Sequence, residues 1–346
     1  MQDACKFKLI LAFLVVLLLD LFLAFSTPAP MKPLRRTASA IIPIIDSHLH
    51  VWAPPSESLK YPYVSPSGDL PPPPSLAEKA SVTSLLQKMN DANVKGSLIV
   101  QPINYGFDHS YVSKCIENHP GRLKGMLLHD PSLNPKDGIK QLEELKKKGF
   151  VGVRFNPYLS PGKDMSDPTN NGGATLAVFK RCGSVDIRMP VGIMCFQGFE
   201  KHRDDIVKLI EHSPETPVII DHFGFTTLGE DDNRGDNAFR DLLNVASRYP
   251  SVHVKISAPF RVTSNKNGGD KKSPYEDVKE KRFKQLLETI GAERLMFGTD
   301  FPFVLDEENI CGYKETVELV MSWADNEKDR QAIMGGTAEK LFGAWG

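Results

Sequence analysis

The chain lacks several common sequence signatures. It contains no Walker-type phosphate loop, no glycine-rich dinucleotide fingerprint and no repeat of fixed period, which argues against nucleotide-binding folds and solenoids. The five cysteines, at positions 5, 115, 182, 195 and 311, form no C-x-x-C pair, and no Asn-x-Ser/Thr glycosylation sequon occurs. A disulfide framework is therefore not indicated, and both facts favour a reducing compartment.

Neither sign of charge is in excess. The chain has 42 Lys and Arg residues and 43 Asp and Glu residues, which gives a formal net charge of −1 at pH 7. Without a basic surplus there is no bulk electrostatic attraction to nucleic acid or to an anionic membrane, so no nucleic-acid partner is expected. Apolar residues make up 41% and charged residues 25% of the 346 residues, which is typical of a globular domain.

One long apolar run is present, near the amino terminus. Residues 9–25 are apolar except for a single acid, and they follow two lysines, a pattern typical of a signal peptide or a signal anchor. The basic stretch MKPLRRTASA, from Met31, also fits a second start site or a transit-type sequence. We expect a targeting or anchor segment over 1–40 and a mature domain over 41–346. Chloroplast or cytoplasm stays open against secretion or membrane association through residues 9–25.

The mature domain alternates between two kinds of segment. Eight β-branched apolar runs are separated by amphipathic segments, which predicts a (β/α)₈ TIM barrel. A doubly wound open sheet would place a glycine-rich turn after an early strand, and none is visible. The expected strands cover 41–46, 96–101, 122–130, 150–156, 190–195, 217–221, 252–257 and 294–298, and the expected helices include 84–92, 139–148, 204–212, 238–249 and 283–290.

A proline-rich stretch, 53–75, follows the first expected strand. It is too long for a simple turn between a strand and a helix, so we interpret it as an insertion that forms a lid over the barrel mouth. Tyr61 and Tyr63 within it are candidates to reach the site. The alternative is a solvated surface decoration.

Polar and ionisable side chains gather at the carboxyl ends of the expected strands, where TIM barrels place their active sites. Side chains alternate along a strand, so Asp46, His48 and His50 are expected to share one face. Arg154 and Asn156 likewise share a face of the fourth strand. The later strands contribute His222 after the sixth, Lys255 on the seventh and Asp300 after the eighth.

Three motifs, in this order, carry a resemblance to a known family. DSHLH follows the first strand, IIDHFG covers the sixth and FGTDFP covers the eighth, and the chain ends in IMGGTAEKLFG. Together they resemble the amidohydrolase superfamily over residues 41–346. The resemblance is greatest to the amidohydrolase-related branch, which includes lactonases and amino-carboxymuconate-semialdehyde decarboxylases, and within it to plant-type members. Dimers are common in this branch, which makes a homodimer an expectation.

The resemblance implies one divalent metal ion, with zinc as the first candidate and manganese as the second. His48, His50, His222 and Asp300 would be its ligands. Asp300 would otherwise be the general base for the attacking water, and His222 would otherwise polarise the substrate carbonyl. Asp221 is interpreted as structural, a support for neighbouring backbone.

Two positions depart from the family pattern. Arg154 occupies the place where dinuclear members carry a carbamylated lysine, and a guanidinium cannot bridge two metals, so a second ion is not expected. Met194 and Cys195 occupy the place where many mononuclear members have a histidine. Metal-free action, as in some lactonases of the branch, therefore stays an alternative. Arg154 could also serve only in an ion pair, with Asp300 or Asp130.

The cations indicate the class of substrate. Arg154 and Lys255 are expected to face the barrel mouth and to hold a small acid, since a guanidinium fork suits a carboxylate. Asn156 and Tyr158 are expected to hydrogen-bond the substrate from the wall. The predicted activity is hydrolysis of a carboxylate-bearing lactone or amide, and the alternative is a metal-dependent decarboxylase (lyase) of a small unsaturated acid.

Overall fold

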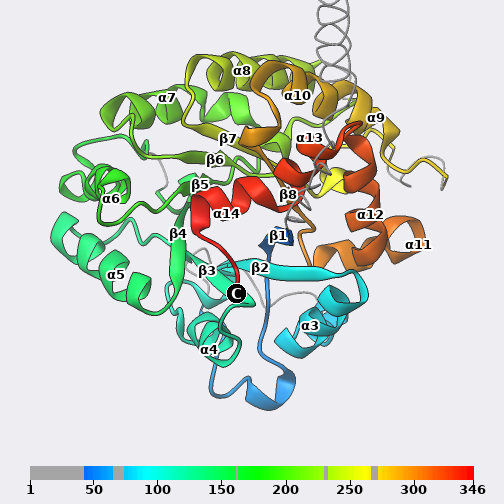
Figure 1. Ribbon diagram of the computed structural model, residues 1–346. Coiled ribbons are helices and arrows are strands. Elements are labelled where there is room, and N and C mark those ends of the chain that lie inside the picture. Colours follow the sequence, from blue (N-terminus) through cyan, green and yellow to red (C-terminus); the bar gives the residue numbers. More distant parts are fainter. Residues whose placement is uncertain (1–42, 65–73, 161–162, 230–232, 266–271) are drawn as a thin grey trace, which may run out of the picture. The chain divides into compact units, whose positions relative to one another are not determined.

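Short apolar runs rich in β-branched residues form the strands, as expected for strands that are buried on both faces. The eight strands are parallel and pair in chain order (Figure 1). The computed structural model describes residues 43–64, 74–160, 163–229, 233–265 and 272–346. The strands are β1 (Ile44–Leu49), β2 (Val94–Val100), β3 (Leu123–Leu128), β4 (Phe150–Phe155), β5 (Val191–Ile193), β6 (Val218–Ile220), β7 (Val252–Ser257) and β8 (Leu295–Gly298).

The sheet closes on itself because the end of β1 pairs with the segment that follows β8. The backbone N–H of His50 donates to the carbonyl oxygen of Phe301 at 2.7 Å, and that of Asp300 donates to the carbonyl oxygen of His48 at 2.8 Å. Closure confirms the expected TIM-like barrel of eight parallel strands. Each expected strand overlaps an observed one, although β1 begins at Ile44 and runs to Leu49 rather than covering 41–46.

The amphipathic segments form helices that surround the barrel (Figure 1). Capping residues mark some of their starts: the Ser81 side chain accepts a hydrogen bond from the N–H of Ser84, and that of Asn134 from the N–H of Asp137. The helices are α2 (Pro74–Ala77), α3 (Val82–Asp91), α4 (Ser110–Asn118), α5 (Pro135–Lys147), α6 (Ala174–Gly183), α7 (Arg203–His212), α8 (Arg234–Arg248), α9 (Glu276–Val278), α10 (Lys284–Ile290), α11 (Glu308–Cys311), α12 (Tyr313–Trp323), α13 (Glu327–Gln331) and α14 (Thr337–Phe342).

The amino-terminal end of the barrel is filled by the end of the chain. Helix α14 crosses this end in Figure 1, and the Trp345 ring packs so closely on Gly96 that a Cβ there would collide with it. The ammonium group of Lys124 donates to the carbonyl oxygens of Phe342 and Gly343, each at 2.8 Å. The carboxyl ends of the strands are therefore the end at which a site can open.

Some expectations concern segments that the structure describes only in part. The segment 1–40, including residues 9–25, lies outside the described residues, as do residues 65–73 of the proline-rich stretch. Tyr61 and Tyr63 are described, and their rings pack on Tyr111 and Tyr105 at centroid distances of 5.1 and 5.2 Å. Within the described ranges, no helix is both long enough and apolar enough to span a membrane.

Candidate active site

The end of β1 departs from regular strand geometry. Between Asp46 and Leu49, β1 has one residue more than the paired segment of β2, which is a β-bulge. The Asp46 carboxylate accepts hydrogen bonds from the hydroxyls of Thr299 and Tyr313 at 2.6 and 3.1 Å, and burial raises its pKa to about 6. The expectation that Asp46 shares a face with the two histidines is therefore wrong. It anchors β1 to the segment after β8 instead.

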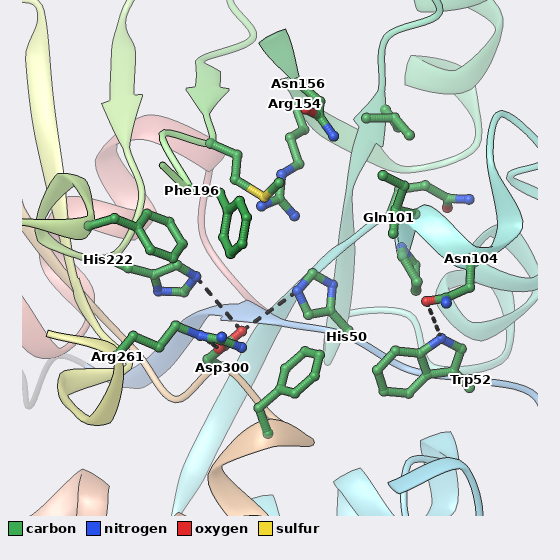
Figure 2. Close-up of a pocket in the computed structure, with 16 residues that line it drawn as sticks. His50, Trp52, Gln101, Asn104, Arg154, Asn156, Phe196, His222, Arg261 and Asp300 are labelled. Carbon is green, nitrogen blue, oxygen red and sulfur yellow. Dashed lines mark hydrogen bonds and ion pairs between the residues drawn. The ribbon is translucent and has the colours of Figure 1, made fainter. Parts of the chain in front are cut away.

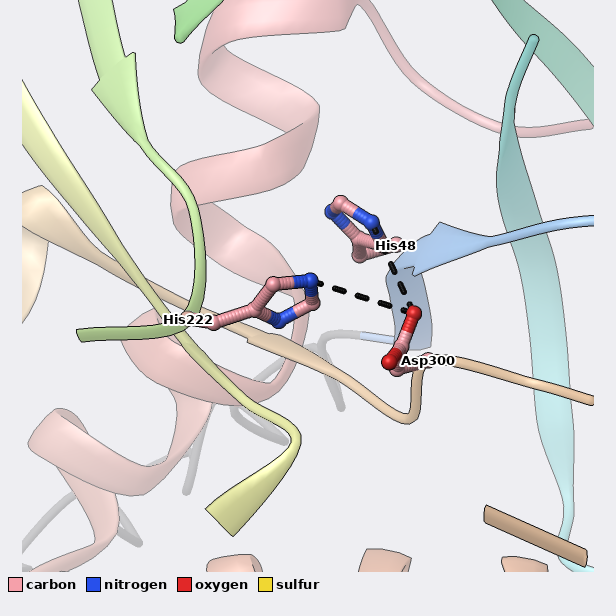
Figure 3. A group of neighbouring side chains, drawn as sticks. All are labelled: His48, His222 and Asp300. Carbon is pink, nitrogen blue, oxygen red and sulfur yellow. Dashed lines mark ion pairs between the residues drawn. The ribbon is translucent and has the colours of Figure 1, made fainter. Parts of the chain in front are cut away.

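Three imidazoles converge on one carboxylate oxygen. The Nε2 atoms of His48, His50 and His222 lie 3.8, 3.7 and 3.8 Å from Oδ1 of Asp300 (Figures 2 and 3). All four side chains are buried. Closure of the barrel thus brings together side chains from the ends of β1, β6 and β8, which are far apart in the sequence.

The second nitrogen of each imidazole has its own partner. Each Nε2 therefore faces Asp300 while each Nδ1 is held from behind, which is how proteins orient histidines that bind metal ions. The Nδ1 atom of His48 lies 3.1 Å from Oδ1 of Asp221, that of His50 lies 2.9 Å from the carbonyl oxygen of Val100, and that of His222 lies 2.8 Å from Oγ of Ser257.

The donor set fits a divalent cation. His48 Nε2 and Asp300 Oδ1 are buried and have no hydrogen-bond partner among the described residues. His48, His222 and Asp300 each offer one ligand atom, and these atoms lie within 4.8 Å of one another. Two imidazoles and a carboxylate suit zinc or manganese. Burial lowers the pKa of His48 to about 4 and that of His222 well below its usual value, so both are neutral at pH 7, as ligands must be.

His50 remains a predicted ligand, because its Nε2 faces the same oxygen of Asp300 as the other two imidazoles. We expected it to hold the ion together with His48, but the group with mutual ligand distances comprises His48, His222 and Asp300. His50 adjoins this group through Asp300 and lines the pocket above it. Its hydrogen bond to the carbonyl oxygen of Val100 requires a proton on Nδ1, which leaves the lone pair on Nε2.

Lys255 lies beneath the imidazoles rather than at the barrel mouth. Its side chain is fully buried and does not line the pocket, and Nζ lies 3.1 Å from Asp221 Oδ1 and 3.0 Å from His48 Nδ1. Asp221 accepts from both groups, since a proton on Nδ1 directed to Asp221 leaves that nitrogen no lone pair for the ammonium group. Lys255 was expected to hold a substrate acid, but it does not reach the pocket where such an acid would bind.

Asp221 is the centre of a buried ion-pair network. Besides Lys255 and His48, it faces Arg154, whose guanidinium nitrogen lies 3.6 Å from Oδ2. Burial alone would raise the pKa of Asp221, but the charges of Lys255 and Arg154 and the hydrogen bond with His48 outweigh it and hold that pKa well below its usual range. Asp221 is structural, as interpreted, but its partners are side chains rather than neighbouring backbone. Arg154 pairs with Asp221 rather than with Asp300 or Asp130, the two partners suggested from the sequence.

Arg261 was not predicted from the sequence. It lies on the helical turn Pro259–Arg261 after β7, and its Nε donates to Asp300 Oδ2 at 2.7 Å. Its guanidinium also stacks on the Phe303 ring, 4.7 Å from the centroid. The sequence offered one weak signal, a cation shortly after a strand end. Its bond to Oδ2 leaves Oδ1 of Asp300 as the oxygen that faces the histidines.

The backbone is strained where the site side chains emerge. His222, Ala258 and Asp300, after β6, β7 and β8, have φ angles of 49°, 48° and 61°. A left-handed conformation of a non-glycine residue costs about 1–3 kcal/mol when the surrounding structure enforces it. Such outliers collect at functional sites, and here they aim His222 and Asp300 at one point.

A cavity of about 150 Å³ lies above the cluster (Figure 2). Arg154 and Asn156 both line it, so the expected shared face is observed. Tyr158 does not line it, because its hydroxyl accepts from the N–H of Gln197 and contacts His202. The lining residues are His50, Trp52, Gln101, Pro102, Ile103, Asn104, Leu128, Arg154, Asn156, Met194, Phe196, His222, Phe225, Arg261, Asp300 and Phe303.

Known proteins resemble the chain over nearly the whole described domain. The family model described as Amidohydrolase matches residues 45–344. The 4-sulfomuconolactone hydrolase of Hydrogenophaga intermedia is 25% identical over 309 residues, which cover 86% of this chain and 88% of that protein.

Two solved structures share the fold. A probable 2-pyrone-4,6-dicarboxylic acid hydrolase of Acinetobacter baumannii, with citric acid bound, superposes with a TM-score of 0.66 at 19% identity, over 87% of this chain and 99% of that chain. An amidohydrolase of Burkholderia multivorans, with zinc bound, superposes with a TM-score of 0.61 at 21% identity, over the same shares. With a family match that spans most of its length, the chain belongs to the amidohydrolase family of hydrolases.

Proposed function

We propose that the protein is a metal-supported hydrolase that opens small lactones, or amides, that carry a carboxylate. The observation that carries the proposal is the convergence of three neutral imidazoles on Oδ1 of Asp300 at the base of a pocket that Arg154 lines. The resemblance to a 4-sulfomuconolactone hydrolase supports a lactone as the substrate.

Asp300 is proposed as the general base. Its Oδ2 is engaged by Arg261, so the unpartnered Oδ1 is the atom available either to take the proton from the attacking water or to bind a metal ion. His48, His222 and Asp300 would hold a divalent ion, which when bound would supply Lewis-acid chemistry to the substrate carbonyl and to water. His50, whose Nε2 lies 3.7 Å from Asp300 Oδ1, is proposed as a further ligand at the base of the pocket.

Arg154 and Asn156 are proposed to orient the substrate. Both line the pocket, and a guanidinium fork binds a carboxylate with two parallel hydrogen bonds. The Asn156 side-chain oxygen accepts the N–H of Tyr158, which fixes the amide so that its NH₂ group is the end offered to a substrate oxygen. This fixed orientation favours one reactive pose, which is one source of rate gain in a bound complex.

A side-by-side assay tests the reaction type. The purified protein is incubated with carboxylated lactones, matching amides and a carboxylated muconate-like acid, and ring opening is scored against release of CO₂. We expect ring opening, reduced about 10³-fold in Asp300→Asn because the base is lost. Asp306→Asn, which changes an exposed carboxylate nearby on the chain, is the matched control. Release of CO₂ without ring opening would replace the hydrolase by the decarboxylase.

Elemental analysis tests the metal. We expect about one zinc or manganese ion per chain, and its loss in His222→Ala. A metal content near zero, with activity that persists in chelator, would leave only the metal-free variant, in which the histidines and Arg154 hold the substrate directly.

The remaining expectations also stand as proposals. The stretch 53–75 is proposed to cover the barrel mouth, since it follows Trp52, which lines the pocket. Plant-type membership, a homodimer and membrane association through residues 9–25 are proposed from the sequence. Light scattering after gel filtration tests the dimer, and the location of a fluorescent fusion tests the targeting of the chain.

A further inference from the structure

We infer that the pocket selects a substrate with one negative charge on a flat apolar body, over both an uncharged ring and a dicarboxylate. This inference rests on the proposed function and names its substrate class. It follows from the weak pairing of one of the two guanidinium groups at the pocket wall and from the chemistry of the remaining wall.

Two guanidinium groups line the pocket within the described ranges, and one of them is already matched. Arg261 donates through Nε to Asp300 Oδ2 at 2.7 Å and stacks on Phe303 at 4.7 Å. Its charge is thus offset by a carboxylate, and its position is fixed by the ring. The third nearby cation, Lys255, is sealed beneath His48 with Asp221 as its partner and cannot reach the pocket.

Arg154 is paired more weakly than Arg261. Its closest carboxylate oxygen, on Asp221, is 3.6 Å away, beyond a hydrogen bond, and that carboxylate already has Lys255 at 3.1 Å. Its Nε is buried and has no hydrogen-bond partner among the described residues. A guanidinium with unsatisfied donors at a pocket wall is a site for one carboxylate, bound through two parallel hydrogen bonds.

The rest of the wall offers little to a second carboxylate. Aromatic rings and aliphatic side chains form much of it, among them Trp52, Ile103, Leu128 and Phe196. Figure 2 shows the rings of Trp52 and Phe196 among the side chains that line the pocket. A carboxylate buried against such a surface without a partner loses its hydration. A planar apolar body, in contrast, gains from leaving water at the same surface.

The side-chain amide of Gln101 is also unavailable to a second carboxylate. Its NH₂ group donates to the carbonyl oxygens of Gly106 and Asp108 at 3.3 and 2.9 Å. Both of its donors are therefore used, and the amide cannot rotate to offer them to an anion without breaking these bonds.

A matched series of rings tests the inference on the metal-loaded protein. The probes are 2-pyrone, 2-pyrone-6-carboxylate and 2-pyrone-4,6-dicarboxylate, which carry zero, one and two carboxylates. Calorimetry measures Kd and ring opening measures kcat/KM. We expect the monocarboxylate to exceed both others about 10-fold or more in each quantity. Arg154→Gln is expected to remove its advantage over the uncharged ring.

A second cation on the wall gives the converse test. Ile103→Arg, on the helical turn Ile103–Tyr105, is expected to raise the dicarboxylate relative to the monocarboxylate about 10-fold, while Ile103→Gln, of similar length and without charge, does not. A dicarboxylate bound and opened as well as the monocarboxylate by the unaltered protein would overturn the inference and leave the lactonase proposal intact. If no ring opens, the lactonase proposal fails, and the order of the three Kd values still decides the inference.

Discussion

Replacing Asp221 by Asn is expected to destabilise the protein strongly, because the change leaves a buried ammonium group without its counter-charge. Asp221 and Lys255 are both fully buried, with Oδ1 and Nζ 3.1 Å apart. Removing one partner of such a pair costs about 3–5 kcal/mol of unfolding free energy. Arg154, 3.6 Å from Oδ2, adds a second unopposed charge, so we expect the upper half of this range.

A double-mutant cycle isolates the pair. Lys255→Met should cost less than Asp221→Asn, since Asp221 keeps Arg154 and His48 as partners. Combining the two changes removes the stranded ammonium group, so the double variant should be more stable than Asp221→Asn alone, by about 2 kcal/mol. Urea unfolding, followed by tryptophan fluorescence and circular dichroism, measures the four free energies.

An exposed lysine on the protein surface provides the control. Lys328→Met removes an exposed lysine whose pairing with Glu293, at 3.7 Å, is a surface contact, and its effect should lie within about 0.5 kcal/mol. Effects of Asp221→Asn and Lys255→Met that add to within about 0.5 kcal/mol would refute the reasoning, because independent sites add and coupled ones do not.

Three further predictions concern pH, metal affinity and packing. Burial lowers the pKa values of His109 and His129 from 6.5 to about 4, so the unfolded chain binds more protons than the native protein between these values; stability should fall as the pH drops through this window, by up to about 1.4 kcal/mol per pH unit for each histidine. Urea unfolding midpoints measured against pH check this, and the dependence should be smaller in His109→Phe. A midpoint that does not change with pH in the unaltered protein would contradict it. Ser257→Ala removes the partner of a metal-facing imidazole and should weaken zinc binding about 10–100-fold in a competition titration. Gly96→Ala forces a methyl group against the last tryptophan and should cost about 1–3 kcal/mol in thermal unfolding, unless the carboxyl-terminal segment moves aside.

The barrel was predictable from the sequence because its signals are local. Each strand is a short β-branched run between turn residues, and each expected helix has one apolar face. Helices α6 and α12 were not predicted, nor were the short helices α2, α9, α11 and α13. The motifs around His48, His222 and Asp300 lie at the ends of strands, so strand order alone was enough to predict that they meet.

The pairing of charges was not predictable, because it depends on distances between strands that are remote in sequence. Asp46 turns toward Thr299 and Tyr313 because a bulge shifts β1 against β2, and no residue pattern announces that bulge. Lys255 faces inward as expected from alternation, but only the structure shows that Asp221 holds it below the pocket floor. Arg261 lies on a three-residue helical turn. Such a turn is too short to show the helical or strand periodicity from which the direction of a side chain is predicted.

Closure of the barrel also has a consequence for biosynthesis. The Ser47 hydroxyl bonds to the carbonyl oxygen of Phe297, which is 250 positions later in the chain, and the imidazole-carboxylate cluster spans a similar separation. A nascent polypeptide on the ribosome therefore has none of this assembly until its eighth strand has emerged. Until then, β1 exposes an unpaired edge that other chains can bind, so this step is where a molecular chaperone would have most effect.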